Sequence, residues 1–187
     1  MARFVDRLLG AARLDRATYE EVEADPGSTG QAVLVVALVA IASGIATVDQ
    51  YGTHGIVIGT IGSLVAWFVW AYMVWLVGTK WLPEPGTHAD VGQVVRTTGF
   101  SAAPGLLLVL AIIPALAAIV GVVTNVWMLV AMVIAVRQAL DFHSTGRAVL
   151  VAVLGFVAYV AVFVLVAMVF GVGAGLLEAV HPAAAPN

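Results

Sequence analysis

Ser101 is the residue in the longest apolar part of the chain whose type could do covalent chemistry. It stands in Gly99-Phe100-Ser101-Ala102, and a serine hydroxyl becomes a nucleophile only when a base lies within hydrogen-bond reach. The four histidines all fall in predicted loops or in the C-terminal tail: His54, His88, His143 and His181. Their spacing matches no metal-ligand motif, and the chain contains no cysteine. We therefore predict no enzyme, no catalytic or metal-binding residue and no cofactor.

Uncharged polar groups are the other candidates inside the apolar segments. No ionisable residue lies well inside a predicted span, whereas proton- and ion-coupled transporters usually place one there. Thr124, Asn125, Ser63 and Ser101 could line a small-solute path, but interhelical hydrogen bonding is the commoner use of such groups. We expect Ser101 to bond a carbonyl freed by a nearby proline. The candidate polar and packing residues within the membrane are Ser101, Pro104, Asn125 and Trp127.

Charged residues gather where the apolar segments end. Arg96, Arg137, Asp141 and Arg147 are expected at one mouth of a central helical hairpin. Two interpretations remain open: simple anchoring and orientation of the helices, or a docking site for a partner protein or a lipid head group. The same cluster could receive the acidic side chains that precede the first span, namely Glu20, Glu21, Glu23 and Asp25.

The overall composition predicts an integral membrane protein. Hydrophobic residues make up 62% of the chain, charged residues only 10%, and the mean hydropathy is +1.06. A soluble domain is nearer to about 45–50% apolar and about 25% charged. The net charge of −3 argues against nucleic acid as a partner. We expect the bilayer itself, other membrane proteins or a second copy of the chain as partners.

A charge-free run from Thr97 to Val136 predicts the central hairpin. This run contains 40 residues, or about 60 Å of helix, whereas a hydrocarbon core is about 30 Å thick. The run is therefore long enough for two crossings, with the turn near Pro114 and a kink at Pro104. A re-entrant loop would leave the same arginines on one side, although irregular backbone exposed to lipid is costly.

The complete pattern predicts an all-α polytopic bundle of five transmembrane helices with an N-terminal amphipathic helix. Residues 1–30 form an amphipathic and acidic segment, in which Phe4, Val5, Leu8 and Leu9 share one helix face. This helix could lie in the membrane interface or pack on the ends of the other helices. The membrane domain covers 31–177 and the tail 178–187, which we expect to be mobile. The predicted spans are 31–48, 56–77, 99–116, 117–136 and 148–177.

The basic residues predict the orientation of these spans. With five crossings, every lysine and arginine falls on one side of the membrane and none on the other. The positive-inside rule then places the N-terminus in the cytoplasm and the C-terminus outside, in a plasma or inner membrane.

Three stretches resemble the Yip family, the Ypt/Rab-interacting membrane proteins with five spans. They are the approach to the first span (Leu14-Asp15, Tyr19, Asp25-Pro26 and Thr29-Gly30-Gln31-Ala32), the segment Arg96-Thr97-Thr98-Gly99-Phe100-Ser101-Ala102-Ala103-Pro104 with Pro114 and Trp127, and the segment Val136-Arg137-Gln138-Ala139-Leu140 with Thr145-Gly146-Arg147-Ala148. The resemblance covers roughly residues 10–170. It implies five helices, a cytoplasmic N-terminus and a scaffold or adaptor role. Eukaryotic relatives bind small GTPases, but their Asp-Leu-x-Gly-Pro motif is absent here, which puts GTPase binding in doubt for this chain.

Three functions are therefore carried forward. The first is a non-enzymatic membrane scaffold or adaptor that works through helix packing and its cytoplasmic face. The second is an accessory subunit of a larger respiratory or photosynthetic complex. The third is a small-solute channel, for which the polar groups in the spans would form the path.

Overall fold

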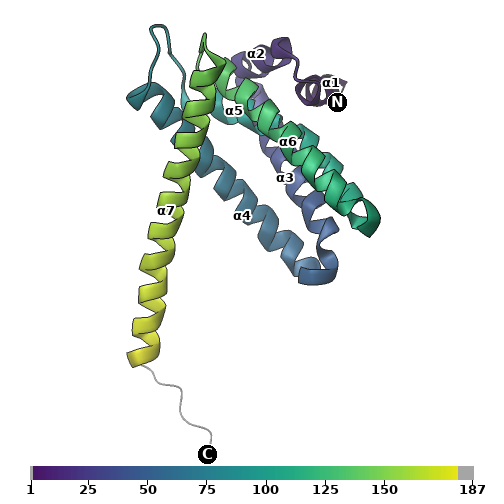
Figure 1. Cartoon of the computed structure of the whole chain (residues 1–187), viewed down its shortest axis with the longest axis vertical. Coiled ribbons are helices and arrows are strands. Elements are labelled where there is room, and N and C mark those ends of the chain that lie inside the picture. The colour runs from purple at the N-terminus through teal and green to yellow at the C-terminus, as the bar shows by residue number, and fades with distance from the viewer. Residues whose placement is uncertain (1, 181–187) are drawn as a thin grey trace, which may run out of the picture.

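The computed structural model describes residues 2–180 of the chain, and every regular element among them is helical (Figure 1). This confirms the predicted all-α fold. In chain order the elements are α1 (Ala2–Ala12), α2 (Arg16–Ala24), the 3-10 turn η1 (Pro26–Ser28), α3 (Thr29–Ala46), α4 (Val48–Leu76), the π-helical turn η2 (Val77–Trp81), α5 (Val91–Ser101), the 3-10 helix η3 (Ala103–Ile112), α6 (Pro114–Ala139) and α7 (Thr145–Val180). The predicted tail lies mostly outside the described residues.

Five helices are long and apolar enough to cross a membrane, as the sequence predicts. These candidate spans are Pro26–Ala46, Tyr51–Trp81, Val91–Ile112, Pro114–Ala139 and Thr145–Val166. The third candidate span begins at Val91 rather than at residue 99, because the more polar first turns of α5 and the apolar residues after them form one helical segment. There Asp90 forms a capping box with Gln93: the Asp90 carboxylate accepts from the Gln93 main-chain N–H, and the Gln93 side chain accepts in return.

The central hairpin is built around its two prolines. Helix α5 ends at Ser101, and Pro104 near the start of the next element is followed by 3-10 rather than α geometry to Ile112. Proline lacks the N–H that an α-helix needs at that position, so the helix changes type there. The chain reverses at Ile113, which is extended, and Pro114 opens α6 as its first residue.

The polar segment 49–55 differs from its predicted loop. The chain turns at Thr47, where α3 ends, and α4 begins at once at Val48. Within this first part of α4 only Gly52 leaves helical geometry, with φ 65° and ψ −177°. Glycine adopts such an angle at little cost, so the segment kinks within one residue and remains helical on both sides.

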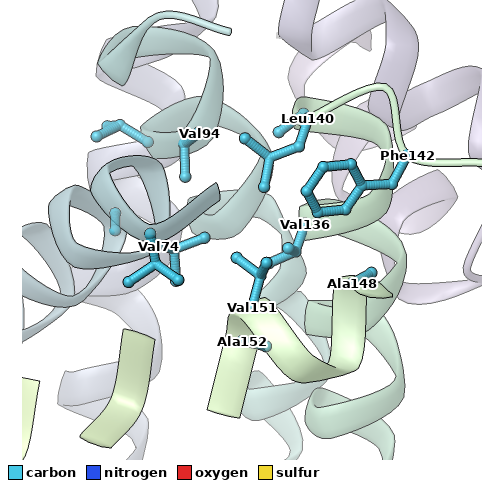
Figure 2. Packing of buried hydrophobic residues seen from close by; sticks show 12 residues of the cluster. Val74, Val94, Val136, Leu140, Phe142, Ala148, Val151 and Ala152 are labelled. Atoms are coloured by element: carbon cyan, nitrogen blue, oxygen red, sulfur yellow. The ribbon is translucent and has the colours of Figure 1, made fainter. Parts of the chain in front are cut away.

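The core consists of two clusters of buried hydrophobic residues, one on each side of α5. In α5 itself every residue from Val94 to Ser101 is buried. Figure 2 shows one cluster, where Val74 of α4, Val94 of α5 and Val136 of α6 meet Val151 of α7. The other cluster joins α1, α2 and α3 to the opposite side of α5, η3 and α6, with Tyr19 and Phe100 fully buried. Helix α5 is therefore the central element of the bundle.

Helix α7 leaves the bundle as it proceeds. At Gly155 its backbone lies close to Val74, because a Cβ at that glycine would come within 2.8 Å of the valine side chain. Beyond this point α7 diverges from α3 and α6 (Figure 1), and the side chains from Val160 to Val166 are all exposed. This apolar half-helix is available to lipid or to other helices.

Candidate docking face at the basic end of the bundle

Helices α1 and α2 lie across one end of the bundle, here called the basic end, which also carries Arg96, Arg137 and Arg147. Phe4, Leu8 and Ala11 of α1 pack into the second core cluster, and the Phe4 and Phe100 rings lie 6.5 Å apart. The structure therefore shows the packed arrangement, one of the two predicted for α1. Val5 and Leu9 remain about half exposed (48% and 47%), which leaves an apolar strip suited to a membrane interface.

Arg7 holds α1 and α2 together, and together with the turn to α3 they form a unit that we call the N-terminal cap (residues 2–28). The Arg7 side chain is only 2% exposed. It donates to Glu21 at 3.0 Å, to Asp25 at 2.6 Å and to Gln31 at the start of α3 at 3.0 Å. A buried arginine is tolerated only when such partners satisfy it. Arg7 is thus a structural residue that the sequence analysis did not single out.

Main-chain carbonyls anchor the rest of the cap. The Tyr19 hydroxyl donates to the carbonyl of Ala11 at 3.1 Å, and the indole N–H of Trp127 donates to the carbonyl of Ala12 at 2.8 Å. Both carbonyls lie at the end of α1, where helix carbonyls need partners outside the regular ladder, and that of Ala11 also accepts from the main-chain N–H of Leu14. Trp127, a predicted packing residue, therefore connects α6 to α1.

Arg96 connects the cap to α5. Its guanidinium is buried, with the residue 7% exposed, and donates to the main-chain carbonyls of Val22 and Glu23 in the last turn of α2. Helix C-terminal carbonyls are unsatisfied and carry partial negative charge, so a cation there is favourable. The sequence analysis placed Arg96 near the acidic segment; in the structure it binds the main chain of this segment and not its carboxylates.

Two of the four carboxylates that the basic cluster was predicted to bind are instead bound by side-chain amides. Gln93 of α5 donates to Glu23 at 3.0 Å, and Gln138 of α6 donates to Glu20 at 2.9 Å. The acidic helix α2 therefore docks on the ends of α5 and α6 through glutamines. Amides and carboxylates interact without a full charge pair, which is why charge counting did not identify them.

Glu23 makes this docking sensitive to pH. Burial is the main cause that raises the pKa of Glu23 to about 7 from its ordinary 4.5. The carboxylates of Asp141, Glu20 and Asp90 act in the same direction, and Arg96 opposes them. A proton is therefore held more tightly in the docked state than in the released one.

We expect the cap to be bound most tightly below the ordinary pKa of Glu23 and to loosen as the pH rises towards 7. The Asp25 carboxylate sets the acid limit, because its pKa is lowered by Arg7 and its contribution is lost on strong acidification. After solvent screening the Glu23 effect should be about 1–2 kcal/mol. Hydrogen exchange of residues 2–24 at pH 5.5 and 8, corrected for the intrinsic exchange rate, measures this change in cap stability. Glu23→Gln should abolish the difference in protection between the two pH values. An unchanged difference in the variant would show that Glu23 is not its cause.

The other members of the predicted docking cluster close the turn between α6 and α7. Asp141 has a left-handed backbone (φ 53°), and the main-chain N–H groups of Asp141 and Phe142 donate to the carbonyls of Gln138 and Arg137. This is a Schellman arrangement, in which aspartate is tolerated at the left-handed position. Arg137 also donates to the carbonyls of Phe142 and His143. These contacts give both residues a structural role in the turn.

Arg147 and Glu84 tie this turn to the loop that precedes α5. Arg147 donates to the carbonyls of Leu82 and Pro83, and its Nε lies 3.7 Å from a Glu84 oxygen. The Glu84 carboxylate also accepts from the main-chain N–H of His143 at 3.0 Å, which is the main cause of its lowered pKa. The sequence analysis missed Glu84, because its position between Pro83 and Pro85 was the only signal in the sequence that set it apart.

The predicted residues within the membrane have separate surroundings. The Ser101 hydroxyl donates to the carbonyl of Thr98 at 2.7 Å, in the last turn of α5. The missing N–H of Pro104 would free the carbonyl four residues earlier, that of Phe100, so Ser101 does not bond the predicted carbonyl. Asn125 is exposed on α6 and donates to the carbonyl of Gly121 in its own helix at 2.8 Å. Ser63 and Ser101 line one cavity, and Asn125 does not line it. Asn125 therefore lies apart from the cavity that Ser63 and Ser101 share.

Comparison with known proteins yields one match. The family model described as the Yip1 domain matches residues 14–173, close to the range over which the sequence motifs indicate a resemblance. No curated protein and no solved structure matches the chain.

Proposed function

Because this chain belongs to the Yip1 family and is a multi-pass membrane protein, we propose that it is a non-enzymatic scaffold or adaptor. It acts through helix packing and through the face at its basic end. The observation that carries the proposal is the N-terminal cap. Arg7 and Arg96 are both almost completely buried: Arg7 joins α1 to α2 and reaches Gln31 of α3, and Arg96 binds the end of α2 to α5. The cap thereby becomes a preassembled surface.

The outward side of this surface carries charges of both signs. The exposed charged side chains of α1, α2 and the turn between them are Arg3, Asp6, Arg13, Asp15, Arg16, Glu20 and Glu21. Mixed exposed charge around partly exposed apolar residues such as Val5 and Leu9 is typical of the polar rim and centre of a protein interface. The docking surface is therefore the cap itself, and Arg137 and Arg147 hold the α6–α7 turn and the loop before α5 at the same end of the bundle.

The proposed location follows from the distribution of basic residues. All eight lysines and arginines belong to segments at the basic end. The positive-inside rule supports a cytoplasmic basic end, with the N-terminus inside and the C-terminus outside a plasma or inner membrane. A partner of the cap is then a cytoplasmic or peripheral protein.

Photo-crosslinking in the native membrane tests the scaffold proposal. A photoreactive amino acid at Arg13, which is exposed and lies between α1 and α2, should capture a partner protein. The same group at Asp49, exposed at the opposite end of the bundle, is the matched control and should not capture it. After mild detergent extraction without light, we expect a lone protomer or a homo-oligomer. Capture from both positions, or from neither, would contradict the proposal.

The second candidate, an accessory subunit of a larger membrane complex, is favoured by the exposed apolar surface. Asn125 is exposed in the middle of the bilayer-facing side of α6, where a polar side chain is more stable against another helix than against lipid. The far half of α7 adds a long unpacked apolar surface. A stoichiometric complex that survives extraction, with crosslinks from Val122 of α6 and none from Arg13, would support this candidate over the scaffold.

A further inference from the structure

A cavity of about 420 Å³ lies between α3, α4, α5, η3, α6 and α7. It is open to the outside of the bundle, and Trp67, Trp70, Met128, Met132 and Phe156 dominate its wall. Three of its polar groups, those of Trp67, Thr98 and Ser101, are bonded to the protein itself. The Trp67 indole N–H donates to the Thr98 hydroxyl at 3.2 Å, which in turn donates to the carbonyl of Val94. The cavity therefore offers an incoming ligand mainly hydrocarbon and aromatic surface.

A second cavity of about 220 Å³ adjoins the first and is different in character. It lies between α3 and α4 near their connecting turn, lined by Ser43, Thr47, Tyr51, Gly55 and Ser63 among others. Ala40, Ser43 and Ser63 line both cavities, so the two spaces meet at these residues. The smaller, more polar cavity lies near the turn between α3 and α4, at the end of the bundle opposite the N-terminal cap (Figure 1).

The two serines at the junction have hydroxyl groups available for a ligand. The hydroxyls of Thr47 and Thr60 donate to carbonyls of their own helices, as is common for such residues within membranes. Within the described part of the chain, the side chains of Ser43 and Ser63 make no such bond. Both serines line the apolar cavity and the more polar one, which is the position that the polar group of an amphipathic molecule would occupy.

Charge determines what kind of polar group fits. No charged residue lines either cavity. Asp49 is the only charged residue in the connecting segment 47–55, and every lysine and arginine belongs to the other end of the bundle. An anionic phosphate head group would therefore meet a like charge and no cation. Hydroxyl and ester groups suit these surroundings, because serine hydroxyls can both donate to them and accept from them.

We propose that the two cavities form one binding site for a neutral single-chain lipid, such as a monoacylglycerol. The hydrocarbon chain lies in the larger cavity against Trp67 and Trp70, and the uncharged head group binds Ser43 and Ser63. The larger cavity has about twice the volume of the smaller one (420 against 220 Å³), which suits a hydrocarbon chain in the first and a small head group in the second. The open side of the cavity lets the chain enter from the bilayer. This site is independent of the proposed scaffold role.

Native mass spectrometry of the full chain in mild detergent tests the proposal. Monoolein is the probe, and oleoyl lysophosphatidylglycerol, with the same chain and an anionic head group, is the matched ligand. We expect one monoolein per chain, bound at least tenfold more tightly than the anionic lipid. Ala66→Phe, which fills the larger cavity, should reduce monoolein binding at least tenfold. Ala118→Phe, on the exposed side of α6 and outside both cavities, should leave it unchanged.

A variant with Ser43→Ala and Ser63→Ala tests the head-group contact without adding bulk. Both residues are exposed, so the fold should tolerate the change even if Ala66→Phe does not fold. Loss of one or two hydrogen bonds should weaken monoolein binding about five- to thirtyfold. Equal binding of both lipids, unchanged binding in the serine variant, or a dimer that excludes lipid from the cavity would each overturn the proposal.

Discussion

Arg96→Met should release the N-terminal cap from the bundle and leave the membrane helices in place. The substitution removes the donor to the part-buried Glu23 carbonyl and one of the two donors to the buried Val22 carbonyl, which still accepts from the Ser28 hydroxyl at 2.8 Å. A carbonyl left without its donor costs about 1–3 kcal/mol, so the cap should be less stable by about that amount. Hydrogen exchange of residues 2–24 should then accelerate about five- to hundredfold, since 1.4 kcal/mol corresponds to a factor of ten.

Arg16→Met is the control for this experiment, because Arg16 is exposed and begins the same helix α2. Its exchange should match that of the wild type. If Arg96→Met left the protection of residues 2–24 unchanged, Arg96 would not hold the cap. The docking surface described above would then lose its main support.

Gly99→Val should force α3 and α5 apart. A Cβ at Gly99 would lie 2.7 Å from the Cβ of Ala32, 3.0 Å from the Trp67 ring and 3.1 Å from the Ala32 carbonyl oxygen. One of these neighbours is backbone, so a rotamer change cannot relieve the contact. Overpacking of this kind costs typically 1–3 kcal/mol, and we expect a value at or above the upper end. Unfolding in mixed detergent micelles, followed by helix content, measures the loss.

Gly62→Val is the matched control, because Gly62 belongs to the membrane helix α4 and a Cβ at this position would have no neighbouring atom within 4 Å. Its effect should be small or slightly stabilising, since valine removes the conformational freedom of glycine. A similar loss for both variants would show that glycine-to-valine exchange in a membrane helix is costly by itself. The close approach of α3 and α5 would then not be the cause.

The architecture could be predicted from the sequence because its signals are strong. The length of the charge-free run and the position of Pro114 indicate a hairpin, and the structure places its turn at Ile113. Pro104 was expected to bend the third span, and the chain is 3-10 helical from Ala103 onwards. These features depend on backbone chemistry and on the thickness of a bilayer, both of which act locally.

The candidate docking site could be predicted only in part, because its contacts are long-range and use main-chain atoms. Arg96 binds carbonyls of residues more than 70 positions away, and Trp127 binds the carbonyl of Ala12 across 115 positions. A carbonyl carries no signature of residue type, so charge pairing suggested carboxylates as the partners. Asp141 was grouped with the arginines because it is charged, although its role in the structure is to adopt the left-handed backbone that ends α6.

The cavities were not predictable from composition either. Ser43 belongs to α3, whereas Ser63 and Trp67 belong to α4, and the angle between these two helices brings the three residues to one cavity. The helical periodicity of each span alone does not determine that angle. Asn125 illustrates the same limit, because its position within α6 was clear, whereas its outward direction was not.

Single-cysteine labelling in intact cells tests most directly the claim that five spans present the cap to the cytoplasm. The natural chain has no cysteine, so one thiol can be placed at a time, at Asp6, Asp49, Ile113 or Ser144, which are all exposed. With a membrane-impermeant maleimide, we predict labelling at Asp49 and Ile113 and protection at Asp6 and Ser144 until the cells are opened. Labelling of Asp6 in intact cells, or protection of Ile113 together with Asp6, would contradict the account.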